Sequence, residues 1–440
     1  MRTVRSLGCA SAQVAHLRKC IGQLTRNPKG DQYFRPMSSW QPLIDGALAE
    51  AARSALRDIA VQIGQHSKQP EDLVLFWAYA SNELDTTVSY PAAVDRLLES
   101  VDERDGALQL HGGLAGIGWT LAHVGDPDDC EEFLATLDAT LVGALTGPGW
   151  AGSCDLIVGL TGLAVYFLER LSGDRDVPVA RAGLERVVQE LRARATAQPP
   201  GLTWHTDPAL LPDWQRAQAP NGYYNCGVAH GVPGTISVLA RAAAYIPSCR
   251  DLIDGAMRWL DVQRVPETGG FTTWIIPGRT PTRTRSAWCY GDPGVATATW
   301  AAAARIGAPI EPWRTLALAC ARGEAAGIVD ASLCHGAFGL AHLFNRCFQA
   351  SGDLEFRNAA RSWIERGLAM RRPGEGVGGF LAHMKKDANP WVVTDAFLEG
   401  AAGIGLVLLA ALGDTEPNWD RLLACDLPFE RLGDSRAAGR

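Results

Sequence analysis

The amino-acid sequence predicts an all-α fold, an α/α toroid in which six to seven helix pairs form an inner and an outer ring. One observation is a repeated glycine pair, G-x-x-G, followed each time by an apolar, often alanine-rich stretch. A second is the amphipathic segment between successive apolar stretches, as expected when a buried helix has a water-facing partner. A third is the scarcity of segments in which polar and apolar residues alternate as they do in strands.

The first helical pattern begins after Asp45, where apolar residues recur at steps of three or four and predict a helix with one buried face. We expect two shorter helices over residues 72–80 and 92–101, separated by polar or proline-containing turns. The apolar stripe of the first helix consists of Leu48, Ala52, Leu56, Ile59 and Ile63.

The first 30 residues hold six basic side chains and no Asp or Glu. They lack the apolar core of a secretion signal, so we interpret them as a flexible extension. The predicted organisation is a flexible basic extension over residues 1–40, the ring over 41–425 and a C-terminal tail over 426–440.

The glycine pair occurs six times at intervals of 45 to 72 residues, which fits a two-helix unit with loops of variable length. The stretch 159–168 is apolar on nearly all sides and predicts a buried helix, whereas 179–195 is amphipathic. We expect the glycines to let the inner helices crowd together at one end. No strand precedes them, so they are not nucleotide-binding loops. The pairs are Gly113/Gly116, Gly159/Gly162, Gly231/Gly234, Gly291/Gly294, Gly336/Gly339 and Gly400/Gly403.

Two segments depart from the helical pattern. Residues 269–276 predict a short extended segment bounded by Pro277 and Gly278. The proline- and tryptophan-containing stretch 199–220 is interpreted as a loop, and such long connections are where a lip that accepts a peptide could form.

The composition argues against several classes of function. Hydrophobic residues make up 47% and charged residues 20%, the balance of a globular protein. A net charge of −7 argues against a nucleic-acid partner. No run reaches the ~18 apolar residues of a membrane-spanning helix. The eleven cysteines follow no regular spacing, which indicates reduced thiols and metal ligands in a cytoplasmic protein rather than disulfides.

Three residues predict a metal site: Cys289, Cys334 and His335. They precede two successive repeat helices, so the toroid would place them at the same end of the ring. Two thiolates and one imidazole are typical zinc ligands, and a three-ligand set leaves the fourth position open for water or substrate. We therefore expect one Zn²⁺ per chain and a thiol substrate, because metal coordination lowers the pKa of a thiol. The alternative is that both cysteines are ordinary buried residues.

Three short motifs resemble the lanthionine synthetase C family of lanthipeptide cyclases. They are the Trp288–Gly291 run WCYG with its following Pro-Gly, the run CHG at 334–336 and the run AHG at 229–231. The glycine repeats extend the resemblance from about residue 110 to 405. The resemblance implies a stand-alone cyclase that adds cysteine thiols of a precursor peptide to dehydroalanine or dehydrobutyrine. Its partners would be that dehydrated peptide and a separate dehydratase.

The resemblance also implies four catalytic candidates besides the metal ligands. His230 would be the acid/base group and Asp155 would orient it, while Arg285 and Tyr290 would stabilise an enolate oxygen or shape the pocket. The alternatives are a core or metal-supporting histidine, a helix N-cap, a solvated arginine and a packed tyrosine. A second metal pair of Cys226 with His230 is disfavoured, because the neighbouring glycines argue against a continuous helix.

Three other classes of protein remain alternatives. A zinc-dependent prenyltransferase-like subunit would activate a peptide thiol in an α/α barrel, but it usually has a carboxylate among its metal ligands. A toroidal glycosidase would use paired carboxylates and keep its activity after chelation. A LanC-like toroid without cyclase activity would bind glutathione or a partner protein and use zinc structurally.

Overall fold

The computed structural model describes residues 40–104, 106–147, 150–173, 176–282, 284–384 and 389–429. The predicted basic extension therefore lies outside the described residues, apart from Trp40. The predicted boundaries of the ring and of the C-terminal tail stay predictions.

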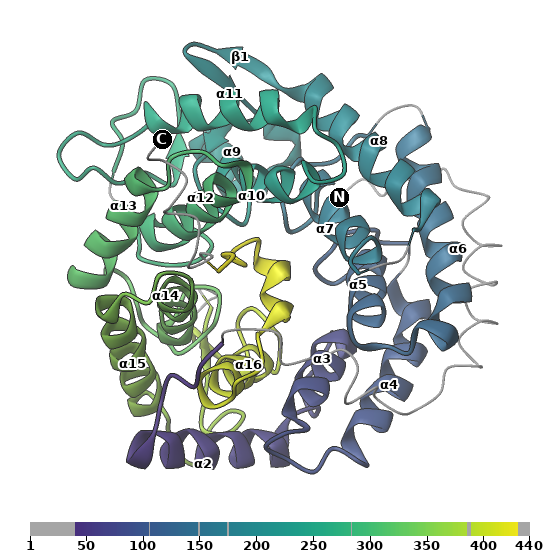
Figure 1. Ribbon diagram of the computed structural model, residues 1–440, viewed down its shortest axis with the longest axis vertical. Coiled ribbons are helices and arrows are strands. Elements are labelled where there is room, and N and C mark those ends of the chain that lie inside the picture. The colour runs from purple at the N-terminus through teal and green to yellow at the C-terminus, as the bar shows by residue number, and fades with distance from the viewer. Residues whose placement is uncertain are drawn as a thin grey trace, which may run out of the picture.

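Seven apolar helices form the inner ring, and each contacts the next around a common axis (Figure 1). The last of them contacts the first, so the ring is closed. The inner helices are α3 (Pro70–Ala80), α5 (Leu114–Val124), α7 (Leu160–Arg170), α10 (Val232–Ala242), α12 (Asp292–Ile306), α14 (Ala337–Ser351) and α16 (Ala401–Leu412).

Seven amphipathic helices cover the inner ring from outside (Figure 1). Six of them follow their inner partner in the sequence, whereas the first, α2, covers α16 and so joins the two ends of the chain. The double ring confirms the predicted α/α toroid, with seven pairs. The outer helices are α2 (Gly46–Gln62), α4 (Ser89–Ser100), α6 (Pro127–Thr146), α8 (Pro178–Arg194), α11 (Cys249–Asp261), α13 (Glu311–Arg322) and α15 (Leu354–Ala369).

Burial explains why the two kinds of helix separate. All twelve residues of α16 are buried, and so are all eleven of α7, because each is enclosed by neighbours on both sides and by an outer helix. The outer helix α2 buries only one stripe, which includes Ala52, Leu56 and Ile59 as the sequence pattern predicts. An apolar helix thus occupies the inner ring and a one-sided helix the outer ring.

The predicted crowding is seen at two glycine pairs, where a Cβ on Gly162 would lie 2.9 Å from Cβ of Leu110 and one on Gly403 would lie 3.1 Å from Cβ of Leu333, but a closer contact recurs in all six pairs. A Cβ built on Gly339 would lie 2.1 Å from the carbonyl oxygen of Leu333, six residues earlier in the same loop. Gly116, Gly162, Gly234, Gly294 and Gly403 meet the equivalent carbonyl at 1.9 to 2.4 Å. The second glycine is therefore required because its own leading loop folds back onto the helix start.

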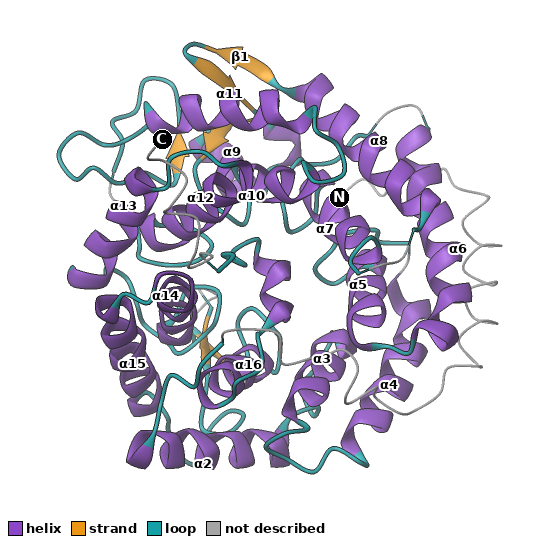
Figure 2. Ribbon diagram, in the orientation of Figure 1, coloured by secondary structure: helices purple, strands orange, loops and turns teal. Residues whose placement is uncertain are grey.

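The strands are short, and most of them lie beside α11 (Figure 2). β5 falls within the predicted extended segment 269–276. The interpretation of 199–220 as a loop is wrong in part, because residues 201–206 pair with neighbouring strands and 213–218 form α9. The strands are β1 (Thr196–Gln198), β2 (Gly201–Thr203), β3 (His205–Thr206), β4 (Tyr223–Asn225), β5 (Trp274–Ile275), β6 (Ala382–His383) and β7 (Trp391–Val392). The short helices are η1 (Val101–Arg104), η2 (Pro208–Leu210), α9 (Asp213–Gln218) and η3 (Asn418–Leu423).

The chain from 418 to 427, which we call the plug, lies inside the ring (Figure 1). Trp419 is fully buried, and Asp420 accepts hydrogen bonds from Arg346 of α14 at 2.8 Å. Trp288 donates its indole N–H to the carbonyl oxygen of Leu423 at 2.9 Å, and Ser237 donates to that of Ala424 at 2.7 Å. The plug thus fills the space that the inner helices enclose.

Two further findings bear on the predictions from composition. The nine cysteines in the described part of the chain are all free thiols. None of the helices in the described ranges is long and apolar enough to cross a membrane.

Candidate metal and catalytic site

The loops that precede the inner helices are joined to one another by backbone hydrogen bonds at one position. The amide N–H of Ala229 donates to the carbonyl of Cys289 at 3.4 Å, that of Cys289 to the carbonyl of Cys334 at 3.4 Å, and that of Cys334 to the carbonyl of Leu398 at 2.7 Å. These residues all stand two places before the first glycine of their pair. The ring therefore brings equivalent loop positions together, although 169 residues separate Ala229 from Leu398.

The structure brings the three predicted metal ligands together. The thiols of Cys289 and Cys334 and an imidazole nitrogen of His335 all lie within 4.8 Å of one another. In the described ranges they form the one group of three or more His, Cys, Asp or Glu residues with such spacing. Ligands of one tetrahedral zinc ion stand about 3.5 to 3.8 Å apart, given bond lengths of about 2.0 to 2.3 Å. The donor types are those of zinc, and the three atoms are close enough for small side-chain movements to bring them to one ion.

The electrostatics of this cluster favour a thiolate. Hydrogen bonds from Cys334 and His335 lower the pKa of the Cys289 thiol well below its ordinary value, although burial opposes them. The more distant positive charge of Arg285 acts in the same direction. Because the proton stays on the partner thiol, the pKa of Cys334 is raised. A deprotonated thiol is the form that binds a metal ion.

Asp330 supports the cluster, and the sequence analysis missed it. Its Oδ2 lies 3.6 Å from Nε2 of His335, and the carboxylate is completely buried. Ser332 donates both its backbone N–H and its hydroxyl to Oδ1, and His383 donates its N–H to Oδ2 at 2.8 Å. At 3.6 Å the contact is an ion pair rather than a hydrogen bond, and a buried carboxylate held in this way can help to orient an imidazole ligand.

A histidine–aspartate pair lies in the neighbouring loops. Nδ1 of His230 is 2.9 Å from Oδ2 of Asp155, while Oδ1 of Asp155 accepts the N–H of Val158 at 2.8 Å. The aspartate thus holds its own turn and contacts the histidine at once. The helix N-cap alternative is wrong, because Gly159 is the N-cap residue of α7 and no side chain caps this helix, whereas the orienting role stays a prediction. Nδ1 of His230 forms the hydrogen bond with Asp155, so Nε2 is the ring nitrogen that can contact a substrate. The side chain of His230 is 39% exposed, so a substrate can reach it.

The contact raises the pKa of His230 and lowers the pKa of Asp155, so it favours a protonated imidazole beside an ionised carboxylate. Burial by itself would lower the pKa of His230, but the hydrogen bond and charge of Asp155 outweigh it, and the pKa is raised. Burial by itself would raise the pKa of Asp155, but the hydrogen bond from His230 outweighs it, and the pKa is lowered. His230 is therefore held closer to its protonated, acidic form.

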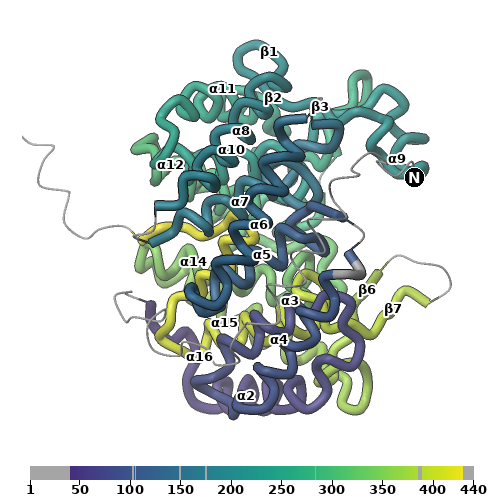
Figure 3. Tube along the Cα trace, turned by 90° about the vertical axis from the view of Figure 1, so that its right-hand side faces the viewer, coloured from purple at the N-terminus to yellow at the C-terminus, as the bar shows by residue number. Residues whose placement is uncertain are grey.

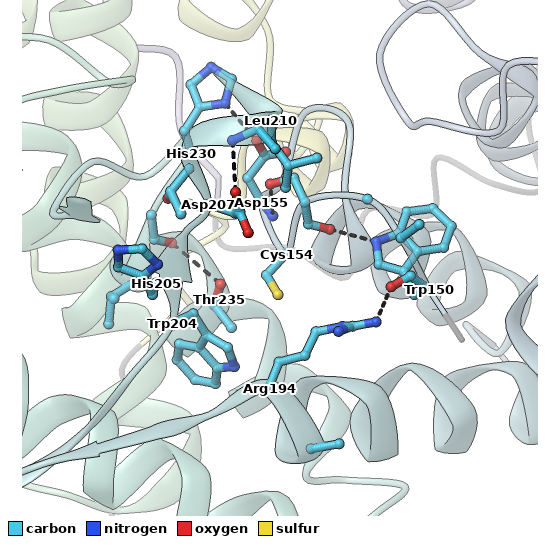
Figure 4. Close-up of a pocket in the computed structure, with 18 residues that line it drawn as sticks. Trp150, Cys154, Asp155, Arg194, Trp204, His205, Asp207, Leu210, His230 and Thr235 are labelled. Atoms are coloured by element: carbon cyan, nitrogen blue, oxygen red, sulfur yellow. Dashed lines mark hydrogen bonds and ion pairs between the residues drawn. The ribbon is translucent and has the colours of Figure 1, made fainter. Parts of the chain in front are cut away.

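His230 and Asp155 line a cavity of about 520 Å³ between two ring loops and β3 (Figure 4). Trp150 and Arg194 lie on one side of it and Trp204 and His205 on another, as Figure 4 shows. Figure 3 shows α9 and the strands β6 and β7 on the same side of the ring.

Tyr290 and Arg285 are close to Cys289 in the sequence but differ in burial, since Tyr290 is partly buried and Arg285 is exposed. The ring of Tyr290 is stacked on that of His230, with centroids 6.0 Å apart, and Asn225 donates to its hydroxyl at 3.4 Å. Burial raises the pKa of Tyr290, so it stays a neutral donor. Arg285 is exposed and acts on the thiols only through its charge.

Glu399 is a further residue at this site that the sequence analysis missed. It stands immediately before the first glycine of its pair, the position that His230, Tyr290 and His335 occupy in theirs. Burial raises its pKa, the positive charge of His335 lowers it, and the charge of Cys289 raises it. The shared register of the repeats was the signal that could have identified it.

Two further histidines, His342 and His111, and Cys226 have structural surroundings. His342 is buried in α14 and bonds Asp420 of the plug at 2.8 Å. Burial lowers the pKa of His111 to about 4, so this histidine is neutral. Cys226 is buried, and burial raises its thiol pKa to about 12. It does not belong to the metal-binding group found among the described residues.

Comparisons with known proteins bear on the family and the fold of the chain. Residues 73–424 match the family model described as "Lanthionine synthetase C-like protein". Among solved structures, the chain is similar to one titled "Nisin cyclase", with 18% sequence identity and a TM-score of 0.67, covering 86% of this chain and 98% of that one. A sugar epimerase from a ruminal bacterium aligns with a TM-score of 0.43 and 11% identity, over 91% of this chain and 98% of that one. No curated protein sequence matches the chain.

Proposed function

Because the chain belongs to the lanthionine synthetase C-like family, we propose that it is a zinc-dependent lanthipeptide cyclase. It would add a cysteine thiol of a dehydrated precursor peptide to a dehydroalanine or dehydrobutyrine of the same peptide, forming a lanthionine or methyllanthionine ring. The observation that carries the proposal is the convergence of Cys289, Cys334 and His335 within 4.8 Å at the ring end where His230 and Asp155 lie.

Cys289, Cys334 and His335 would hold the zinc ion, and Asp330 would orient the histidine ligand. Bound there, the metal supplies a Lewis acid that lowers the pKa of a thiol, so that the thiol reacts as a thiolate at neutral pH. The exposed guanidinium of Arg285 adds positive charge at the mouth of the same site. A peptide thiol arriving there would meet surroundings that favour its deprotonated form.

His230 would supply the proton that completes the addition. When the thiolate forms a bond to the β-carbon of the dehydro residue, the electrons of the double bond move towards the carbonyl oxygen and give an enolate. Nε2 of protonated His230 then donates its proton to the α-carbon. Asp155 keeps the acid ready, because its carboxylate holds Nδ1 at 2.9 Å and raises the pKa of the imidazole.

Tyr290 would stabilise the enolate oxygen and fix the acid in place. It stays protonated at neutral pH and is stacked on the ring of His230. A neutral hydroxyl beside the acid can donate a hydrogen bond to an oxygen that gains negative charge.

The cavity beside His230 would accept the peptide segment that carries the dehydro residue. Its volume of about 520 Å³ suits a few residues rather than a whole peptide, and it is open on one side. Dehydration would come from a separate dehydratase, and the reduced thiols favour work in the cytoplasm.

The test is cyclisation of a synthetic peptide with one cysteine and one dehydroalanine by the purified, zinc-loaded chain. Ring formation leaves the mass unchanged, so the products are treated with N-ethylmaleimide, and mass spectrometry counts the thiols that remain. The expected product resists the reagent, whereas a peptide that stays fully reactive would remove the proposal.

Two variants separate the metal from the acid. Cys334→Ala should lose zinc and cyclisation together, because one of three ligands is gone. His230→Asn should keep zinc and lose rate. Cys226→Ala is the matched control, because this buried cysteine lies outside the metal group, and it should keep both. Ring formation by zinc-free Cys334→Ala at the wild-type rate would contradict the mechanism.

A further inference from the structure

A second cavity lies at the opposite end of the ring, where α7, α10 and α12 end. It has a volume of about 690 Å³. Four arginines line it, and among its described lining residues Asp426 is the one carboxylate. We call it the arginine cavity. The four side chains come from α10, α11, α12 and the plug: Arg241, Arg250, Arg305 and Arg421.

Two of these arginines are neutralised by carboxylates outside the lining. Arg421 pairs with Glu169 at 3.2 Å, and Arg250 pairs with Asp254 at 3.0 Å. Arg241 and Arg305 share Asp426 as their contacting carboxylate, at 3.7 and 2.8 Å. Glu169 acts on Arg241 from a greater distance and is itself paired with Arg421. In the described part of the chain, the two guanidinium groups therefore have one carboxylate in direct contact between them.

The same two guanidinium groups carry unused hydrogen-bond donors. Nη1 of Arg241 and Nη1 of Arg305 are both buried and have no partner among the described residues. The two side chains are only 11% and 19% exposed. A buried charged donor without a partner is costly, so the pair is built for a ligand or is strained.

A competing explanation for the arginines is that they bind backbone carbonyls at the ends of the helices. This explanation accounts for only some of their donors. Arg250 donates to the carbonyl of Ile306 at 2.6 Å, and Arg305 donates to that of Asp426. It leaves Nη1 of both Arg241 and Arg305 unexplained. Burial lowers the pKa of Arg305, Asp426 opposes this, and repulsion from Arg241 adds to it. An added anion would relieve that repulsion.

We infer that the arginine cavity binds a phosphorylated small molecule, with the phosphate group between Arg241 and Arg305. Guanidinium groups bind phosphate oxygens through paired N–H donors, and a phosphate dianion would supply the charge that Asp426 does not. The volume exceeds that of a bare ion. Leu168, Ala240 and Ile306 line the remainder and suit the organic part of such a molecule. This site is separate from the proposed zinc centre.

Pyrophosphate is the probe, titrated by calorimetry into the full, zinc-loaded chain. Arg241→Gln should weaken binding about tenfold or more, the cost of one charge-assisted hydrogen bond. The side chain of Arg241 makes no hydrogen bond to the described residues and only a 3.7 Å ion pair with Asp426, so the variant should fold. Asp426→Asn should bind more tightly, because the competing carboxylate is removed. Arg258→Gln on α11 removes the same charge outside the cavity and should bind as wild type does.

Since pyrophosphate also binds zinc, the zinc-free Cys334→Ala variant must be titrated in parallel. It should bind as tightly as wild type, whatever its cyclisation activity. Loss of binding in this variant would place the ion at the metal and overturn the inference. So would equal affinities of Arg241→Gln and Arg258→Gln, which would mean an adventitious ion only. Binding to phosphatidate vesicles but not to pyrophosphate would also contradict a small-molecule site.

Discussion

Replacing Asp155 by Asn tests whether the aspartate controls the acid. The substitution keeps the shape of the side chain and its bond to the N–H of Val158 but removes the negative charge that faces His230. Asp155 raises the pKa of His230 against the effect of burial, so without it the pKa should fall. A hydrogen bond to a charged group contributes about 1.5 to 3 kcal/mol. Since His230 is 39% exposed, we take the lower end.

About 1.4 kcal/mol corresponds to a tenfold loss of protonated His230 above its pKa. The assay is the pH dependence of kcat/KM for ring closure, with zinc content measured on the same samples. At pH 7 to 8 the rate should fall about tenfold and recover as the pH is lowered, while zinc stays bound. Asp254→Asn, which removes an exposed carboxylate from α11, should keep the wild-type profile. An equal loss at every pH, or loss of zinc, would refute this account of Asp155.

Three other predictions follow from the structure. Asp330→Ala should weaken zinc binding about 10- to 100-fold, measured by competition with a chelator, and unchanged affinity would mean that Asp330 does not orient His335. Gly339→Ala should lower the free energy of unfolding in urea by about 1 to 3 kcal/mol, because its Cβ would meet the carbonyl of Leu333; Gly143→Ala, in open space on α6, should not lower it. Asp420→Asn should cost about 3 kcal/mol, because the fully buried ion pair with Arg346 is lost and Arg346 keeps the partly exposed Glu416 as its charged partner. The folded pKa of Asp420 is lowered to about 2, so its contribution should be full above about pH 4 and disappear as the pH falls through 2. Equal stability of wild type and variant at pH 7 would contradict that pairing.

The sequence was sufficient for features that repeat. The apolar runs after the six glycine pairs predicted six of the seven inner helices, and the seventh, α3, was expected from its own helical pattern. Equivalent loop positions placed Cys289 and Cys334 at one end of the ring. Glu399 shares the register of His335, but its residue type did not attract attention, because the metal was predicted from thiols and imidazoles. The repeat register alone would have identified position 399, but a carboxylate was not among the ligand types that were sought.

Other features had no signal along the chain. Asp330 reaches His335 through a loop whose path depends on three-dimensional packing, and no periodicity marks it. The pairing of Thr196 with Thr203 forms a hairpin too short to show alternation. The glycines were expected to permit helix crowding. Their closest contact is instead a backbone carbonyl of the preceding loop, and the irregular sequence of that loop does not show that it folds back.

Closure of the ring has a consequence for how the chain is made. Trp40 donates its indole N–H to the carbonyl of Ala410, which is 370 residues away, and the plug is enclosed only after α16 has been added. The ribosome must therefore synthesise the chain through α16, which ends at Leu412, before α2 and α16 can meet. Until then the apolar sides of α3 and α14 face water, and contacts of such sequence separation form slowly. We expect the nascent chain to depend on chaperones during this interval, and low temperature during expression to favour the closed ring.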